Sequence, residues 1–155
     1  MLKKDNRFDA YAYRMAQRDL ANPANYLEEG SWITLDADGK IVSADGTKLS
    51  FLCLTSNRKY RDNVSTQAIH PKATYLLGSF EVTVANNPDV ATGDTAFDDS
   101  KVYAYLTPLK VVKDAGTALG VLTPLVEGTD TVDKIVAYSV GPADVESKSL
   151  RILVR

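Results

Sequence analysis

The sequence predicts a mainly β fold: a compact antiparallel β-barrel or sandwich, preceded by an N-terminal arm or short helix. Two observations predict it. Short β-type runs recur between turn residues from Ser31 onward, and the segment 27–54 places two Asp-Gly pairs among three such runs. Asp-Gly is a strong hairpin signal, because glycine and, less readily, aspartate accept the positive φ angles of tight turns. Many short strands with close turns favour a sandwich or barrel over a parallel α/β fold.

The strands expected in the first half surround these turns. The runs 31–35 and 40–43 flank Asp38-Gly39, and Asp45-Gly46 leads into 48–54. The run 73–85 is the strongest strand candidate. Its residues alternate between two faces, which hold Leu76, Phe80, Val82 and Val84 on one side and Tyr75, Ser79, Glu81 and Thr83 on the other. Burying each large apolar side chain contributes roughly 1.5–3 kcal/mol, so this strand should lie in the core. Gly78 marks a bulge or a close backbone approach.

The strands expected in the second half follow a polar segment. Residues 86–100 hold four aspartates and no lysine or arginine, which predicts a solvated loop. Strands are expected at 101–106 and 109–112, separated by Thr107-Pro108, because proline cannot donate to a sheet and causes a bend or an edge. The runs 131–140 and 150–154 complete the set, and Leu150, Ile152 and Val154 share one face of the last run.

We expect one β domain at 27–155 and a distinct N-terminal segment at 1–26. The spacing of Phe8, Tyr11, Ala12, Met15 and Ala16 fits one face of a helix, but alternation in the same segment fits an extended arm equally well. Residues 1–18 carry five lysines and arginines against two aspartates, a charge of +3, whereas the whole chain has -2. The N-terminal segment is therefore a basic, aromatic-bearing extension.

Composition narrows the function classes. The 155 residues suit one domain, and a net charge of -2 gives no general attraction to nucleic acid or anionic membranes. The one cysteine, Cys53, cannot form an internal disulfide. We find no apolar run long enough for a signal peptide or a membrane span, so we expect synthesis in the cytoplasm.

The sequence predicts no catalytic residue, cofactor or metal. His70 and Cys53 could pair as base and nucleophile, but His70 precedes a proline in an expected turn, and Cys53 lies among leucines like a core residue. The aspartates Asp94, Asp98 and Asp99 could hold a hard cation weakly, and an ordinary solvated acidic loop is the favoured interpretation. The segment 56–63, SNRKYRDN, holds Arg58, Lys59, Arg61 and Tyr60 in one short loop. A solvated or partner-facing role is favoured for this loop over nucleic-acid binding.

The order of strands and turns resembles a known family. The segments that carry the resemblance are EGSWITLDADGKIV at 29–42, LGSFE at 77–81 within the strand 75–84, VYAYLTPLKV at 102–111, IVAYSV at 135–140 and LRILV at 150–154. Over residues 27–155 this pattern resembles the capsid decoration, or cement, proteins of tailed bacteriophages. The chain departs from that pattern at Thr107-Pro108, where such proteins often have a glycine-containing turn.

The resemblance implies a non-enzymatic virion structural protein. Such proteins bind the outer capsid surface and stabilise the head by bridging neighbouring capsid subunits, commonly as trimers. The implied partners are the major capsid protein and further copies of the chain, with no direct contact to nucleic acid or membrane. The implied location is the host cytoplasm during assembly and then the capsid surface of the virion. The N-terminal segment is our candidate contact element, with the hypothetical contact residues Lys3, Lys4, Arg7, Phe8, Tyr11, Tyr13, Arg14 and Met15.

Two other function classes stay open at this stage. A tail-tube or head-closure protein can also be a small β-barrel. A carbohydrate-binding or adhesion module would use Trp32, Tyr103 and Tyr105 as a stacking surface. An enzyme would require an acid–base pair that the residues do not display.

Overall fold

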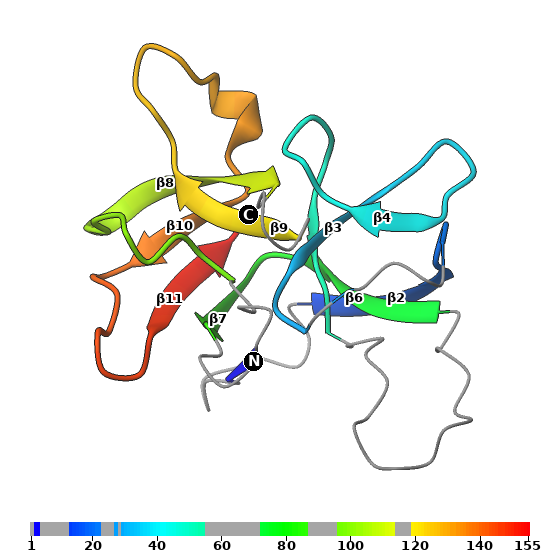
Figure 1. Cartoon of the computed structure of the whole chain (residues 1–155), viewed down its shortest axis with the longest axis horizontal. Coiled ribbons are helices and arrows are strands. Elements are labelled where there is room, and N and C mark those ends of the chain that lie inside the picture. Colours follow the sequence, from blue (N-terminus) through cyan, green and yellow to red (C-terminus); the bar gives the residue numbers. More distant parts are fainter. Residues whose placement is uncertain are drawn as a thin grey trace.

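The body of the protein is built from antiparallel β-strands (Figure 1). The computed structural model describes residues 2–3, 13–22, 27, 29–54, 72–86, 96–113 and 119–155. The strands are β1 (Leu2–Lys3), β2 (Tyr13–Asp19), β3 (Trp32–Leu35), β4 (Ile41–Ser43), β5 (Phe51–Leu52), β6 (Lys72–Gly78), β7 (Phe80–Ala85), β8 (Tyr105–Lys113), β9 (Gly120–Pro124), β10 (Ala137–Val140) and β11 (Ser149–Val154). In these residues, helical structure is confined to the 3-10 turn η1 (Val132–Lys134). The predicted mainly β fold is confirmed.

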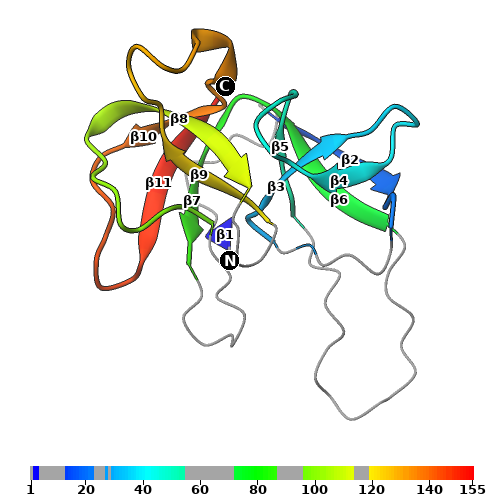
Figure 2. The ribbon, with the colours of Figure 1, turned by 45° about the horizontal axis from the view of Figure 1, so that its top comes forward.

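The strands form one large curled sheet and one small sheet. In the described part of the chain the larger sheet has nine strands, in the order β1-β7-β11-β10-β8-β9-β3-β4, with β5 paired to β3. Strands β2 and β6 form a two-stranded sheet of their own. Figure 2 shows the curl, with β7, β8, β10 and β11 on one side and β2, β3, β4 and β6 on the other. The half-barrel shape agrees with the predicted barrel or sandwich class.

The first Asp-Gly turn forms the predicted hairpin between β3 and β4. The Oδ1 atom of Asp36 accepts hydrogen bonds from the backbone N–H groups of Asp38 (3.0 Å) and Lys40 (2.9 Å). Gly39 has φ 72°, a left-handed conformation in which glycine carries no Cβ penalty. The hairpin is thus determined by local side-chain chemistry.

The second Asp-Gly turn lies against another strand. A Cβ atom on Gly46 would fall 2.1 Å from the carbonyl oxygen of Val111 in β8, so only glycine fits there. The strand predicted at 48–54 is wrong for 48–50 and confirmed for 51–54, where Phe51–Leu52 (β5) pairs with β3, Cys53 forms a bridge with Tyr75, and the N–H of Leu54 donates to the carbonyl of Thr74 (2.8 Å). Before β5, the backbone of Leu49 accepts a hydrogen bond from the hydroxyl of Thr34 (2.8 Å) instead of joining a ladder.

The strand predicted at 73–85 is divided into β6 and β7. The division lies at Gly78, which has φ 101°, and Ser79. Before it β6 pairs with β2, and after it β7 pairs with β11 and β1. The prediction of one strand is therefore wrong, and the special role predicted for Gly78 corresponds to this change of partner. The predicted apolar face is confirmed, since Leu76, Phe80, Val82 and Val84 are all buried.

Two apolar clusters hold the body together. The main cluster contains side chains from both halves of the larger sheet, including Trp32 and Leu76. The second cluster contains Ile33 and Tyr75, and it also includes Leu20 from the N-terminal segment. Successive residues of a strand point to opposite faces, so β3 and β6 each contribute to both clusters. Tyr75 therefore faces away from Leu76, as predicted, and is nevertheless buried.

The N-terminal segment contributes strands to this body. Tyr13–Asp19 is the strand β2, so the helical alternative is wrong for these residues. Strand β1 pairs with β7, and β2 pairs with β6 along its full length. Residues of the predicted extension are thus paired with strands of the predicted β domain.

The remaining predicted elements differ in detail. Strand β8 begins at Tyr105 and runs through Pro108, so the strand predicted at 101–106 is wrong for 101–104 and the separation from 109–112 is wrong. The bend predicted at Thr107-Pro108 corresponds to an irregular register beside Pro108. The run predicted at 131–140 is η1 followed by β10, and the run at 150–154 is confirmed as β11. In the described parts of the chain, no helix has the length and apolar character that a membrane span requires.

Candidate functional site

The outer edge of β2 is the first candidate binding surface. Its inner edge pairs with β6 from Tyr13 opposite Gly78 to Asp19 opposite Lys72. Among the residues that the structure describes, no strand pairs with the outer edge over Tyr13–Asp19. The outer edge is bounded by a bridge between Leu20 and Ile41, just after the strand ends. We call this unpaired row, Tyr13–Asp19, the β2 edge.

The side chains of the β2 edge are mostly exposed, and two of them are arginines. Met15 is 66% exposed, and Arg14, Gln17 and Arg18 are exposed as well, while Ala16 is half-buried against the second cluster. Both faces of the strand therefore meet solvent over most of its length.

The charged residues of the β2 edge differ in their ion pairs. Within the described residues neither Arg14 nor Arg18 has an ion pair, and Arg18 donates only to the carbonyl of Gln17 (3.2 Å). Asp19 lies 4.0 Å from the Nζ of Lys72, an exposed pair of small energetic effect. Arg14 and Arg18 therefore give the edge two exposed positive charges, against the one negative charge of Asp19.

The structure brings together only part of the predicted contact set. Arg14 and Met15 lie side by side in sequence on the β2 edge, and both are exposed. Lys3 lies in β1 and Tyr13 begins β2, and for these two the structure gives only the course of the backbone. The other predicted contact residues lie outside the described residues: Lys4, Arg7, Phe8 and Tyr11. A contact role for any of them stays a prediction.

A second candidate surface lies where β8 begins. Tyr105 pairs with Val140 and Pro108 pairs with Tyr138, so Leu106 and Thr107 together face the single residue Ser139. This two-against-one arrangement is a β-bulge. Leu106 has φ 60°, a left-handed conformation that costs a residue other than glycine about 1–2 kcal/mol. It lies next to Thr107-Pro108, the point at which the sequence departs from the family pattern.

Hydrogen bonds hold the bulge in place. The hydroxyl of Ser139, which is fully buried, donates to the carbonyl oxygen of Ala104 and accepts from the backbone N–H of Thr107 (3.2 Å). The hydroxyl of Thr107 also donates to the carbonyl of Ala104 and accepts from its N–H, both at 3.0 Å. The segment that precedes β8 is therefore fixed to β10 by side chains.

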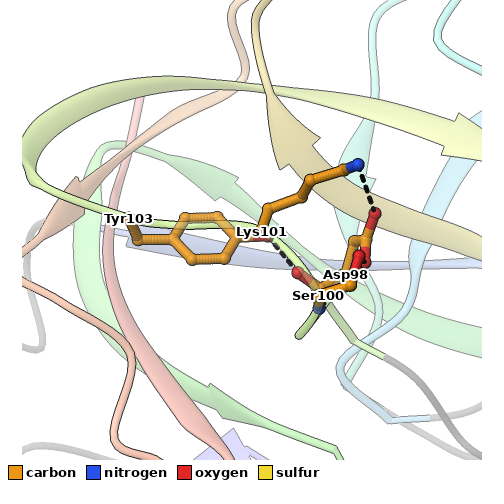
Figure 3. Close-up of polar contacts among 4 residues, drawn as sticks. All are labelled: Asp98, Ser100, Lys101 and Tyr103. Atoms are coloured by element: carbon orange, nitrogen blue, oxygen red, sulfur yellow. Dashed lines mark hydrogen bonds and ion pairs between the residues drawn. The ribbon is translucent and has the colours of Figure 1, made fainter.

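Tyr103 fixes the same segment from its other end (Figure 3). Its ring is 3% exposed and packs edge-on against Phe97, with ring centroids 5.7 Å apart. Its hydroxyl donates to the carbonyl oxygen of Asp98 (2.8 Å). Burial, and next the negative charges of Asp98 and Asp99, raise the pKa of Tyr103. The end of the loop predicted to be solvated is thus anchored by two buried aromatic rings.

The aspartates considered for a cation are otherwise engaged. Oδ1 of Asp98 accepts from the N–H and hydroxyl of Ser100 (3.1 and 2.6 Å), and its Oδ2 lies 4.0 Å from the Nζ of Lys101 (Figure 3). Asp94 lies outside the described residues. In the part of the chain that the structure describes, no group of three or more His, Cys, Asp or Glu side chains could hold a metal ion.

Large apolar side chains at the bulge and just before it are exposed. Val102 is 89% exposed, Tyr105 68% and Leu106 53%. We call these three residues the bulge patch. No feature of the sequence analysis had assigned them a shared surface.

An open polar groove of about 580 Å³ is the third feature of the surface. It is lined by the segment 45–50, by β8 and by the residues around η1. One of its lining residues is Asp130, whose side chain is 4% exposed. Asp130 accepts from the Nζ of Lys110 (2.5 Å) and the N–H of Val126 (2.8 Å), and lies 3.5 Å from the Nζ of Lys134. The hydrogen bond from Lys110, followed by that from Val126, lowers the pKa of Asp130. These bonds explain Asp130 as an anchor of the loop before η1.

The stacking surface considered for carbohydrate is not formed. Trp32 is fully buried and Tyr103 is 3% exposed, so of the three proposed aromatics only Tyr105 reaches solvent. Cys53 is also fully buried, and His70 and the basic-aromatic loop 58–63 lie outside the described residues.

The comparisons with known proteins give no relative. No protein-family model matches the sequence, and neither does any curated protein or solved structure. Its function therefore has to be inferred from the surfaces described above and from the sequence pattern.

Proposed function

We propose that the protein is a non-enzymatic structural protein of a tailed-bacteriophage virion. In this proposal it binds the outer surface of the capsid and stabilises the head by bridging neighbouring capsid subunits. The order of strands and turns over residues 27–155, which resembles capsid decoration proteins, supports it. The structural observation that carries it is the β2 edge, an ordered and basic strand edge on a rigid β body.

An open strand edge is suited to binding another protein. Its unpaired N–H and C=O groups can accept an added strand, and the bound segment gains main-chain hydrogen bonds without opening the existing sheet. Because pairing with β6 already orders β2, this strand loses little conformational entropy when a partner binds to it. Arg14 and Arg18 would steer an acidic capsid surface to the edge, and Met15 would add apolar contact.

Heads assembled without the protein provide the test. We expect the purified protein to co-sediment with such heads saturably. The double variant Arg14→Glu/Arg18→Glu should bind about tenfold or more weakly, because two attractive charges become repulsive. The control Lys113→Glu/Arg155→Glu makes the same charge change at exposed positions away from β2 and should bind like the wild type.

Two outcomes would refute the proposal. Wild-type protein that does not bind these heads would refute capsid binding, and equal binding by the Arg14→Glu/Arg18→Glu variant would refute the role of the β2 edge. Charge reversal is a cleaner test than deletion of residues 1–20. The deletion would also remove β1, β2 and the buried Leu20, and so would expose the second apolar cluster.

A further inference from the structure

The larger sheet has an outer face that carries aromatic side chains. Strands β7, β11, β10 and β8 are consecutive neighbours in this sheet, and their inner faces contribute Val82, Ile152 and Leu109, among others, to the main cluster. Successive residues of a strand point to opposite faces, so the residues next to these point outward. The register aligns one outward row across the four strands, which consists of Pro108, Tyr138, Leu153 and Glu81.

A second outward row lies beside the first. Tyr105 in β8 is opposite Val140 in β10, and Val140 is two residues from Tyr138 on the same face. Tyr105 and Tyr138 are therefore diagonal neighbours on adjacent strands, at the roughly 7–8 Å spacing that aromatic side chains can span. Tyr105 is 68% exposed, Leu153 is 41% exposed, and Tyr138 is half-buried. Two tyrosines and a leucine thus lie together on the outer face.

An ion pair lies at the edge of this apolar surface. Glu81 is directly opposite Leu153, and Arg151 is two residues from Leu153 on the same strand face. The Oε1 atom of Glu81 contacts the Nε atom of Arg151, and the side chains are 32% and 39% exposed. In the described part of the chain, neither side chain has a further hydrogen-bond or ion-pair partner. Oε2 of Glu81 can therefore accept, and the Nη atoms of Arg151 can donate, hydrogen bonds to a ligand.

This combination of groups is complementary to a sugar ring. The C–H groups on the face of a pyranose pack on aromatic rings, and its hydroxyl groups form hydrogen bonds with charged side chains. Within the two rows, the charges of Glu81 and Arg151 cancel, which favours a neutral ligand. The next row, toward the polar groove, holds Arg155 and also Lys110, which pairs with Asp130.

The size of the apolar surface also favours a small ligand. A stable protein interface buries roughly 800 Å² on each partner, far more than three partly exposed side chains provide, whereas one or two sugar rings need much less. Hydrogen bonds from Thr107 to Ala104 and Ser139 fix the start of β8, which carries Tyr105. A contact residue on a pre-ordered segment loses little entropy on binding.

We propose that this outer face binds a neutral glycan. We call it the tyrosine platform and define it as Tyr105, Tyr138, Leu153, Arg151 and Glu81. The rings of the two tyrosines pack on the faces of sugar rings, and the Arg151–Glu81 pair binds their hydroxyl groups. The platform includes none of the residues assigned to capsid binding at the β2 edge, so this inference does not depend on that proposal.

An array of neutral and acidic oligosaccharides, probed with the purified full chain, tests the inference. At least one neutral oligosaccharide should bind. Calorimetric titration with it should give a Kd of roughly 10 μM–1 mM, because the contact area is small. Tyr105→Ala should weaken binding about tenfold or more, because one stacking ring is lost. Tyr105→Phe keeps the ring and should bind nearly as well as the wild type.

A second variant tests the ion pair. The double substitution Glu81→Leu/Arg151→Leu leaves the net charge of the platform at zero and removes its hydrogen-bonding groups. It should also weaken binding about tenfold, because hydrogen bonds to charged groups are the stronger ones. Thermal melts of each variant beside the wild-type protein check that the fold is retained.

The control is Leu49→Ser, at a residue that is 75% exposed in the segment between β4 and β5. It removes exposed apolar surface away from the platform and should leave glycan binding unchanged. The inference is overturned if no neutral oligosaccharide binds, if folded Tyr105→Ala binds like the wild type, or if Tyr105→Phe or Leu49→Ser loses as much affinity as Tyr105→Ala. Binding confined to acidic oligosaccharides would also overturn it, because basic side chains would then account for recognition.

Discussion

The bulge patch and the β2 edge present binding groups in opposite ways. At the bulge patch the exposed groups are apolar, the backbone is strained at Leu106, and buried side chains fix the segment from both ends. At the β2 edge the side chains are mostly polar, the strand is regular, and cross-strand pairing with β6 holds it. The first surface depends on side-chain anchors, whereas the second depends on backbone groups that pair with no strand in the described part of the chain.

This difference has a consequence for mutational sensitivity. Substitutions that disturb the anchors of the bulge patch should change the free energy of unfolding, because the anchors are buried and hydrogen-bonded. Substitutions on the β2 edge should change binding with little effect on stability, because its side chains contact little of the body. Three measurements test this contrast.

The largest effect is expected for Ser139→Ala. The substitution removes the buried hydroxyl that bonds to Ala104 and Thr107, and should lower the free energy of unfolding by about 1–3 kcal/mol. Urea denaturation followed by tryptophan fluorescence would measure it. Ser79→Ala, at an exposed residue between β6 and β7, is the control and should change stability by less than about 0.5 kcal/mol. Equal effects of the two substitutions would show that Ser139 does not fix the bulge.

Removing the hydroxyl of Tyr103 should have a smaller, pH-dependent effect. At neutral pH, Tyr103→Phe should cost about 0.5–1.5 kcal/mol, the usual contribution of one hydrogen bond. The pKa of Tyr103 is raised in the folded state above its ordinary value of 10.0. The resulting stability is fully present below pH 10.0 and is lost as the pH rises toward the higher folded value.

The alkaline limb of a stability curve therefore distinguishes the two proteins. Wild-type protein should lose stability above pH 10.0 more steeply than Tyr103→Phe, so that the difference between them narrows. Thermal melts at closely spaced pH values from neutral to alkaline would measure it. Parallel curves over the whole range would mean that the phenol is not buried and bonded as described.

The smallest effect on stability is expected on the β2 edge. Met15→Ser and Arg18→Gln replace exposed side chains, and each should change the free energy of unfolding by less than about 0.5 kcal/mol. Urea denaturation of both variants and of the wild-type protein would measure these changes. A loss comparable with that of Ser139→Ala would remove the contrast between the two surfaces, because it would show that β2 side chains stabilise the body.

The sequence predicts those parts of the fold that depend on local chemistry. The hairpin at Asp36–Gly39 follows from an aspartate that bonds to nearby N–H groups and a glycine with positive φ. The faces of β7 and β11 follow from alternation, which requires no knowledge of the neighbouring strands. The division of the run 73–85 could not be predicted, because it results from the different partners of β6 and β7, which are distant in sequence.

The candidate surfaces were predictable to different degrees. Charge and aromatic content drew attention to the N-terminal segment, and Arg14 and Met15 are exposed on β2, although the choice between helix and strand required β6 as a partner. The bulge patch was missed because it arises from the pairing of Leu106 and Thr107 with Ser139, more than thirty positions later. The signal was Thr107-Pro108, where proline excludes a regular ladder.

The position of β11 in the larger sheet has a consequence for how fast the chain folds. This strand lies between β7 and β10, and its pairing with β7 joins residues 149–154 to residues 80–85. The sheet cannot become continuous until these distant segments meet. Closing the long loop between β7 and β11 costs entropy, and this cost comes before the contacts between the two strands stabilise the fold. We therefore expect refolding on the millisecond-to-second timescale typical of β proteins with non-local contacts, with β3–β4 forming early as a local hairpin and β11 docking late.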